Sequence, residues 1–411
     1  MLFSSLVFLF TFLPITLLVY YLVPRKVKNV VLLIASLIFY AWGEPVYIFL
    51  MLISILFNYF CGMDIALKAG RKSQVRSLIF TIVVNLFILG FFKYYGFIVT
   101  NLNAILPFYI PYRKLELPIG ISFYTFQTLS YIIDVYRGNV DVQVNLIDFG
   151  TYVTMFPQLI AGPIVQYADV ERQLRERKES LTKFGYGAWF FVMGLAKKVL
   201  LANTIGSIYE NIAAMDGMSV VTAWLGCLAY TFQIYFDFSG YCDMAVGLCR
   251  MLGFDVKKNF RYPYVARNIT TFVRRFNSSV FAWFWDYICE PLWGGWLGTL
   301  VSGILMGLWY AGMWKNAPWQ VTVTGGLLWG IYLAFWQIVE RYALPFLKRL
   351  PPVLGQIYTW FFTALGWVFF FGKTPAASVG YLKVMFGFGG GDVVGVMGRY
   401  LFLGNVFVLV V

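Results

Sequence analysis

Long uninterrupted apolar runs recur along this chain, and they limit what it can fold into. The first reads MLFSSLVFLFTFLPITLLVYYLV. Such runs supply the roughly 20 residues with which an α-helix spans a bilayer. A transmembrane barrel would instead show segments of about 10 residues with alternating polarity. Continuous apolar runs lie at Leu2–Tyr21, Val30–Ala41, Val46–Phe60, Leu78–Phe92, Trp189–Ala202 and Val221–Phe236.

The composition agrees with a membrane protein. Of 411 residues, 60% are hydrophobic and 12% are charged, whereas roughly a quarter of a soluble chain is charged. The formal net charge of +13 has an ordinary cause in such a chain, because cytoplasmic loops collect Lys and Arg. We therefore expect an all-α polytopic membrane protein in contact with membrane lipid, with no nucleic-acid partner.

The basic residues gather in four segments, which predict the orientation of the chain. If all four lie in the cytoplasm, the N-terminus and the Gly43–Pro45 turn lie outside. The first apolar run lacks a basic start and a small-residue cleavage site, so we expect a retained helix of a multi-pass plasma (inner) membrane protein. The basic segments are Arg25–Lys28, Lys68–Arg76, Glu171–Lys183 and Lys257–Arg275.

No linker rich in Gly, Ser or Pro divides the chain, so residues 1–411 predict one integral-membrane domain. The lack of a visible internal repeat disfavours the transporters that are built from inverted repeats. The chain stops inside the apolar run Tyr400–Val411, so we expect a terminal helix that is cut short. The five cysteines show no C-x-x-C spacing, and we expect no metal site.

Polar side chains inside the apolar runs mark candidate sites. An ionisable group there costs about 2.5 to 3.5 kcal/mol and needs a partner or a water-filled cavity. Asp134 and Arg137 are three residues apart, and an ion pair explains them slightly better than a substrate role. In Tyr230–Phe254, structural pairing and cavity lining are equally open, and Gly240 offers a break between two half-helices. The polar candidates of that segment are Gln233, Asp237, Ser239 and Asp243.

A third region begins at Asn268 and includes GLWYAGMW, Gly307–Trp314. Its Trp and Arg side chains fit an aromatic belt with snorkelling arginines. They also fit the wall of a substrate tunnel, where glycine lets a ligand approach the backbone. In the tunnel interpretation the lining residues are Trp309, Gly312, Arg274, Arg275 and Ser278.

Four segments with polar residues among apolar ones follow one another along the chain: LPIGISFYTFQTLSYIIDVYRG, FPQLIAGPIVQY, YFDFSGYCDMAVGLCRMLGF and NFRYPYVARNITTFVRRFNSSVFAWFWDYICEPL. In this order they resemble the membrane-bound O-acyltransferase (MBOAT) family, in particular the bacterial branch that O-acetylates alginate and other exopolysaccharides and D-alanylates teichoic acids. The resemblance implies a ring of about 11 tilted transmembrane helices, with re-entrant and short interfacial helices, around a central funnel.

The resemblance also implies the substrates. The donor would be a cytoplasmic acyl thioester, either acyl-CoA or an acyl carrier protein, and no cofactor would be bound. The acyl group would pass to an extracytoplasmic polysaccharide, or to a partner acyltransferase that modifies one.

The departures from the family pattern concern histidine, which the chain lacks entirely. Asn277 stands at the histidine of the family's R-R-W-H, Tyr310 at that of G-L-W-H-G, and Leu333 at a third. Imidazole, with an ordinary pKa of about 6.5, suits the removal of a proton from an acceptor hydroxyl. A phenol with a pKa of about 10 does not. Because burial raises the pKa of a carboxyl group, Glu290 and Asp286 are candidates for a replacement base.

Two main interpretations follow. The chain is an acyltransferase with a rearranged site, or it is a non-catalytic MBOAT-fold scaffold or acyl conduit for a partner transferase. In either case the phenol can donate a hydrogen bond to a thioester carbonyl. A channel or transporter is a third interpretation and rests only on the intramembrane Asp and Arg residues. The whole chain lacks histidine. The missing site histidines are therefore explained equally by an exclusion of histidine from the entire sequence and by the selective loss of one active site.

Overall fold

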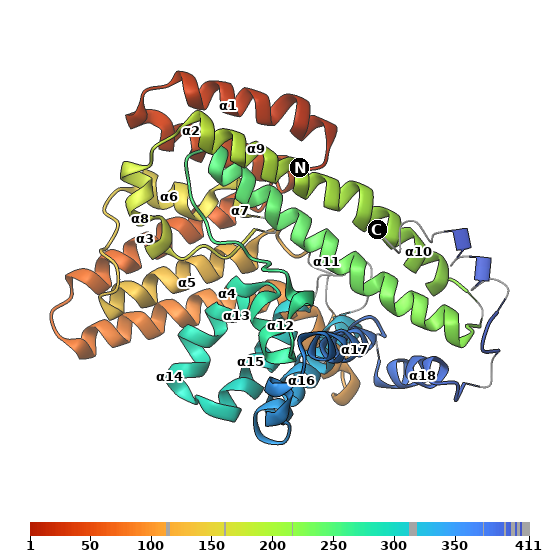
Figure 1. The fold of residues 1–411 in the computed structure, drawn as a ribbon. Coiled ribbons are helices and arrows are strands. Elements are labelled where there is room, and N and C mark those ends of the chain that lie inside the picture. The colour runs from red at the N-terminus through yellow and green to blue at the C-terminus, as the bar shows by residue number, and fades with distance from the viewer. Residues whose placement is uncertain are drawn as a thin grey trace. The chain divides into compact units, whose positions relative to one another are not determined.

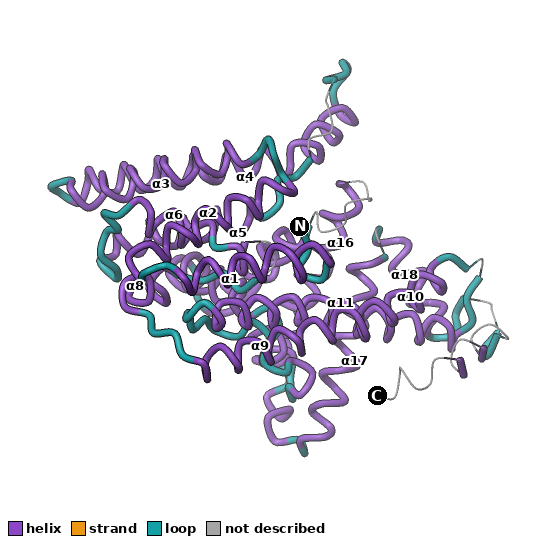
Figure 2. Tube along the Cα trace, turned by 90° about the horizontal axis from the view of Figure 1, so that it is seen from above, coloured by secondary structure: helices purple, strands orange, loops and turns teal. Residues whose placement is uncertain are grey.

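In a computed structural model, the described residues form helices joined by loops, and no strand occurs among them (Figures 1 and 2). A bilayer offers no water to backbone N–H and C=O groups, so helices that satisfy these groups internally are expected. The all-α prediction is confirmed. The structure describes residues 1–111, 116–159, 162–215, 217–311, 319–372, 374–389, 392–395, 399–400 and 403–404.

The described helices fall into two compact units. Unit 1 holds residues 1–195 and 241–258, and unit 2 holds residues 196–240 and 259–411. Unit 1 contains η1 (Phe8–Phe12), α1 (Leu13–Leu22), α2 (Arg25–Gly43), α3 (Ile48–Leu67), α4 (Arg71–Ile105), α5 (Ile121–Arg137), α6 (Leu146–Thr154), α7 (Phe156–Leu159), α8 (Tyr167–Glu176) and nearly all of α9 (Leu181–Ala196).

Unit 2 carries the remaining elements, and the long helix α11 (Val220–Met251) contributes residues to both units. The others are η2 (Lys197–Ala202), α10 (Asn203–Ala213), η3 (Pro263–Val265), α12 (Ile269–Arg275), α13 (Ser278–Phe284), η4 (Trp285–Cys289), α14 (Glu290–Leu292), α15 (Gly295–Tyr310), α16 (Trp319–Tyr342), η5 (Pro345–Arg349), α17 (Pro352–Phe371) and α18 (Pro375–Met385).

Within the described ranges, five helical stretches are long and apolar enough to cross a membrane. They are α2, α3, α4, α17 and the continuous stretch Leu181–Ala213, which runs from α9 through η2 to α10. Two shorter apolar helices are Phe8–Leu22 and α15. Four of the five long stretches coincide with apolar runs identified in the sequence, which confirms a membrane protein. The arrangement of about 11 helices in a ring stays a prediction.

Helix α11 corrects one expectation, because it continues through Gly240 without a break. A glycine inside a helix costs about 1 kcal/mol relative to alanine, which packing can offset. Gly247, two turns further along α11, shows such packing: a Cβ added there would lie 2.6 Å from the carbonyl oxygen of Gly187 in α9. Gly247 therefore marks close packing between α9 and α11, and α11 has no half-helix boundary at Gly240.

Polar side chains join the helices of unit 1. Helices α3, α4 and α5 contact one another and lie side by side (Figure 1). Between α3 and α4, Asn58 Nδ2 donates to Asn85 Oδ1 at 3.1 Å, and Asn85 Nδ2 donates to Asn58 Oδ1 at 2.9 Å. Such reciprocal amide pairs hold helices together where the lipid supplies no hydrophobic driving force.

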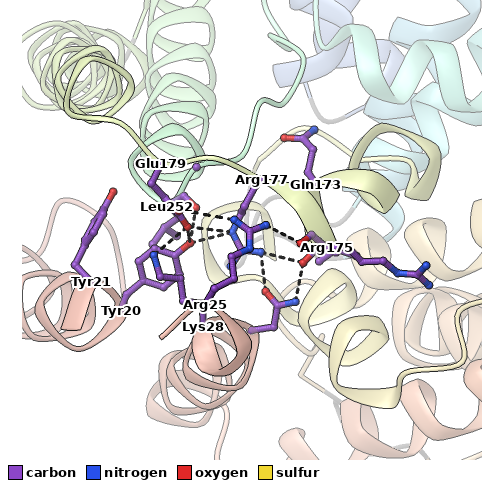
Figure 3. Close-up of polar contacts among 12 residues, drawn as sticks. Tyr20, Tyr21, Arg25, Lys28, Gln173, Arg175, Arg177, Glu179 and Leu252 are labelled. Atoms are coloured by element: carbon purple, nitrogen blue, oxygen red, sulfur yellow. Dashed lines mark hydrogen bonds and ion pairs between the residues drawn. The ribbon is translucent and has the colours of Figure 1, made fainter. Parts of the chain in front are cut away.

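A charged cluster around Glu179 joins the corner between α1 and α2 to the loop that follows α8 (Figure 3). Three cations surround its carboxylate: Lys28 Nζ at 3.2 Å, Arg177 Nε at 3.8 Å and Arg25 Nη1 at 3.9 Å. Tyr20 donates its hydroxyl to Glu179 Oε1 at 2.8 Å. Burial raises the pKa of Glu179, but the hydrogen bonds from Tyr20 and Lys28 outweigh it and hold the pKa below its ordinary value.

Replacing Glu179 by Gln is expected to lower the free energy of unfolding at pH 7 by about 2 kcal/mol. The reason is that Arg177, whose side chain is 2% exposed, would stay charged without a counter-charge. A carboxyl with a depressed pKa stabilises the fold above its unfolded pKa of about 4.3 and loses this effect as the pH falls through the folded pKa. Melting temperatures of the unaltered protein and the variant should therefore converge in acid.

Glu176→Gln is the matched control, because Glu176 pairs with Arg172 on the surface with both side chains more than half exposed. Exposed pairs contribute about 0 to 1 kcal/mol, so this variant should melt close to the unaltered protein. A Glu179→Gln effect that stays constant from neutral to acid pH would contradict the charge-based explanation.

Candidate functional site

Asn277 and Tyr310, which the resemblance predicts to stand at two histidine positions, lie in contact inside unit 2. Nδ2 of Asn277 donates to the hydroxyl oxygen of Tyr310 at 2.7 Å, although the residues are 33 positions apart. Both side chains are buried, with Asn277 at 0% and Tyr310 at 2% exposure. The hydrogen bond is therefore shielded from solvent, and the low dielectric of the protein interior strengthens it.

A third buried residue, Asn259, orients the Asn277 amide. Its Nδ2 donates to Asn277 Oδ1 at 2.7 Å, and its Oδ1 accepts from the backbone N–H of Ser279 at 2.9 Å. The backbone oxygen of Asn259 also accepts from Ser278 N at 2.8 Å. Since the Asn277 oxygen faces Asn259, its NH2 group faces Tyr310. The three side chains form a directional series of hydrogen bonds that includes the phenol.

The backbone at Asn277 is left-handed, with φ of 51°. Among non-glycine residues, Asn, Asp and His adopt this conformation most readily, and such outliers concentrate at functional sites. Asn277 forms the corner between α12 and α13, and the corner is held by the hydrogen bond from Arg261 N to Arg275 O at 3.1 Å. At the end of α12, Arg274 is exposed and Arg275 is half-buried.

Glycine packing between α15 and α16 positions Tyr310, the last residue of α15. Gly303 on α15 faces Gly330 on α16, and Gly307 faces Gly326. On each helix the two glycines are four residues apart. A Cβ added to Gly303 would lie 2.5 Å from the carbonyl oxygen of Gly330. Small residues at this spacing let membrane helices approach backbone to backbone. The end of α15 is thereby fixed against α16.

Aromatic rings enclose the phenol of Tyr310. Its ring lies edge-on to Trp329, with centroids 5.2 Å apart, and to Phe370 at 6.1 Å. Trp329 stacks on Trp367 at 5.0 Å. Leu333, the third histidine position, is buried one helical turn after Trp329 on α16. These surroundings are apolar, so the Asn277 amide is the polar partner described for the phenol.

Glu340 of α16 holds the start of α12, the helix that leads to Asn277. Its Oε1 accepts from Ile269 N at 2.6 Å, and its Oε2 accepts from Thr270 N at 3.0 Å and Thr270 Oγ1 at 2.7 Å. A carboxylate at a helix N-terminus satisfies backbone donors that have no partner within the helix and complements the helix dipole. Glu340 therefore fixes α12 to α16 and, with it, the corner that carries Asn277.

Neither Asn259 nor Glu340 was among the residues singled out from the sequence. Glu340 had a usable signal, because a lone carboxylate in an apolar helix demands a partner. Asn259 had only the general tendency of asparagine to bond nearby backbone groups at turns.

Replacing Glu340 by Gln is expected to lower the free energy of unfolding by about 2 kcal/mol, since hydrogen bonds to charged groups contribute about 1.5 to 3 kcal/mol. Thermal unfolding in detergent would measure this change. Gln337→Met is the control, because the buried Gln337 amide donates to Leu333 O of its own helix and joins no second element. If both variants melt alike, Glu340 does not hold α12.

The other candidates of this region differ in their surroundings, and one lies outside the described residues. The ring of Trp309 lies near Phe284 of α13, with centroids 6.4 Å apart. Asp286 and Glu290 are exposed and not buried, and their function as a replacement base stays a prediction. Gly312 lies outside the described residues.

The polar candidates of α11 differ in their surroundings. Asp237 pairs with Lys198 at 2.6 Å, which is structural pairing within unit 2. The side-chain oxygens of Gln233 and Ser239 are buried without a hydrogen-bond partner, so cavity lining at these positions stays a prediction. Asp243 is half-buried and belongs to unit 1.

Comparison with known proteins identifies the family. The family model described as "MBOAT, membrane-bound O-acyltransferase family" matches residues 34–373. "Probable alginate O-acetylase AlgI" of Azotobacter vinelandii is 40% identical over 403 residues, which cover 95% of this chain and 79% of that protein. AlgI of Pseudomonas aeruginosa is 39% identical, with 95% and 75% covered. "Peptidoglycan O-acetyltransferase" of Helicobacter pylori is 32% identical, with 95% and 80% covered. The chain belongs to the membrane-bound O-acyltransferase family.

Proposed function

We propose that this protein takes part in acyl transfer across the inner membrane, moving an acetyl-like group from a cytoplasmic thioester donor toward an extracytoplasmic polysaccharide or a partner protein. Family membership and the relatives named for O-acetylation of alginate and peptidoglycan support this function. The observation that carries it is the buried hydrogen bond between Asn277 and Tyr310, at the positions of two family histidines. In this proposal the N-terminus lies outside, and the donor is acyl-CoA or an acyl carrier protein.

The chemistry available at this pair is hydrogen bonding. In the reaction, the acceptor hydroxyl oxygen attacks the thioester carbonyl carbon, the C–S bond breaks, and the leaving thiolate takes up the proton lost by the hydroxyl. The Tyr310 hydroxyl, which accepts from Asn277, would donate a hydrogen bond to the carbonyl oxygen and stabilise the developing negative charge. Neither an amide nor a phenol removes the acceptor proton near neutral pH. We therefore expect proton removal to limit the rate.

A second function is favoured by the exposure of Asp286 and Glu290. If neither carboxylate serves as a base, the protein acts as a scaffold or acyl conduit for a partner transferase on the outer side. It would then bind the donor without consuming it. The tunnel residues proposed from the sequence, Arg274, Arg275 and Ser278 among them, would keep their binding function in both cases.

Purified protein in lipid nanodiscs, supplied with acetyl-CoA and alginate oligosaccharides, separates the two functions. Transfer that exceeds the transfer by Tyr310→Phe supports the first. Saturable binding without transfer, together with an extracytoplasmic protein that co-purifies, supports the second. Tyr342→Phe is the control, because Tyr342 is exposed at the end of α16. Absence of both binding and transfer would contradict both functions.

A further inference from the structure

Unit 1 contains a group of buried polar side chains that lack hydrogen-bond partners. The atoms concerned are the hydroxyls of Tyr40 and Tyr124, both Nε2 and Oε1 of Gln127, and Oε1 of Gln158. All four side chains are buried, and both glutamines have 0% exposure. Among the described residues of unit 1, these are the side-chain atoms in this condition. They come from only three helices, α2, α5 and α7.

Contacts bring helix α2 to both of the others. The hydroxyl of Ser36 on α2 accepts from Phe156 N at the start of α7, at 3.0 Å. Tyr40 follows Ser36 by one helical turn and shares its face. At the C-terminal end of α2, the C-cap residue Glu44 accepts through Oε1 from Ile119 N, two residues before α5, at 3.4 Å.

Helices α5 and α7 are joined through Tyr152 of α6. Its hydroxyl donates to Gln127 O at 3.2 Å, and its backbone oxygen accepts from Gln158 Nε2 at 2.8 Å. Gln127 lies one turn after Tyr124 on α5, so these two side chains share a face. The four side chains therefore belong to helices that are joined either by hydrogen bonds or through Tyr152 of α6.

The lack of partners is not general for buried tyrosines and glutamines of this unit. Tyr131, also on α5, accepts from Gln143 N at 3.0 Å. The Gln143 side chain donates to Tyr167 at 2.9 Å and accepts from Asn145 N at 2.9 Å. Tyr131, Gln143 and Tyr167 thus have protein partners, whereas the unsatisfied atoms described in unit 1 gather on α2, α5 and α7.

Burying a hydroxyl or amide without a partner is costly, and the cost is greater where hydrocarbon surrounds the protein. Native proteins meet this cost with ordered water, which typically makes two to four hydrogen bonds to otherwise unsatisfied groups. The four side chains are neutral and offer both donors and acceptors, which suits a small neutral ligand. We propose that α2, α5 and α7 enclose a hydrated site, in which ordered water molecules bind Tyr40, Tyr124, Gln127 and Gln158.

Substitutions that remove only the hydroxyl test this site by the sign of their effect. If water bridges these groups, Tyr40→Phe and Tyr124→Phe each lower the melting temperature by about 1 to 3 °C, because the water loses a partner. If the site is dry, removing an unsatisfied hydroxyl raises the melting temperature or leaves it unchanged, and the proposal is overturned. Tyr131→Phe is the control, since its hydroxyl has a protein partner and its loss lowers the melting temperature in either case.

A density map of the unaltered protein, at a resolution that shows ordered water, provides an independent measurement. The proposal expects water density within hydrogen-bond distance of at least two of the four side chains. Close packing without such density, or density for a lipid or another organic ligand, would overturn it. This test does not depend on acyl transfer, so its outcome is separate from that of the proposed function.

Discussion

Replacing Asn277 and Tyr310 together by His is expected to raise acyl transfer by at least about 100-fold, because a positioned general base contributes about 10² to 10⁴ in rate. The two side chains already lie in contact in a buried site. The left-handed backbone at position 277 is one that histidine tolerates. Imidazole, with its ordinary pKa of about 6.5, would remove the acceptor proton that phenol and amide leave in place. The rate of thiol release from acetyl-CoA, with a polysaccharide acceptor present, measures the change.

The matched control adds an imidazole elsewhere. Tyr342→His changes a tyrosine that is 58% exposed at the end of α16, so it tests whether a surface imidazole alone hydrolyses the thioester. Its rate should equal that of the unaltered protein. If the double variant binds acetyl-CoA as tightly as the unaltered protein and remains equally slow, Asn277 and Tyr310 do not occupy the position of the base.

Replacing Gly330 by Ala is expected to lower the free energy of unfolding by about 3 kcal/mol, the upper end for overpacking a closely packed interior. The added methyl group would overlap the backbone carbonyl of Gly303, which cannot rotate away as a side chain can. Helix α15 would have to shift relative to α16, and Tyr310 at its end would move with it. Thermal unfolding and acetyl-CoA binding should therefore both decline.

Gly380→Ala separates this effect from helix propensity. Gly380 lies in α18, and no atom lies within 4 Å of a Cβ added there. Alanine is favoured over glycine in a helix by about 1 kcal/mol, so this variant should be as stable as the unaltered protein or more stable. Equal melting temperatures for the two alanine variants would contradict close backbone packing between α15 and α16.

The extent of sequence-based prediction differs between the helices and the site. Apolar runs located four of the five long apolar stretches among the described residues but not α17, because hydrophobic length alone decides whether a helix can span the bilayer. The break expected at Gly240 was wrong, since a glycine marks either a break or close packing and its neighbours in space decide which. Comparison with the family motifs pointed to Asn277 and Tyr310 as residues of one site. The function of Asn259 was not, because it depends on a corner formed in the folded chain.

The exposure of Asp286 shows a second limit. Asp286 lies in η4, a π-helical turn from Trp285 to Cys289. A π-helical turn shifts the residues that follow around the helix axis, so a face inferred from a period of 3.6 residues no longer holds. The sequence therefore indicated a carboxylate near the aromatic segment but not the side of the helix to which it points.

We propose that this protein keeps the binding geometry of an acyltransferase site and lacks its base. Acetyl-CoA binding and acetyl-CoA consumption should be compared for the unaltered protein and for a family member that carries both histidines, in nanodiscs of the same lipid. We expect saturable binding by both proteins and consumption at least about 100-fold slower in this one. Equal rates of consumption would show that this protein has a base after all.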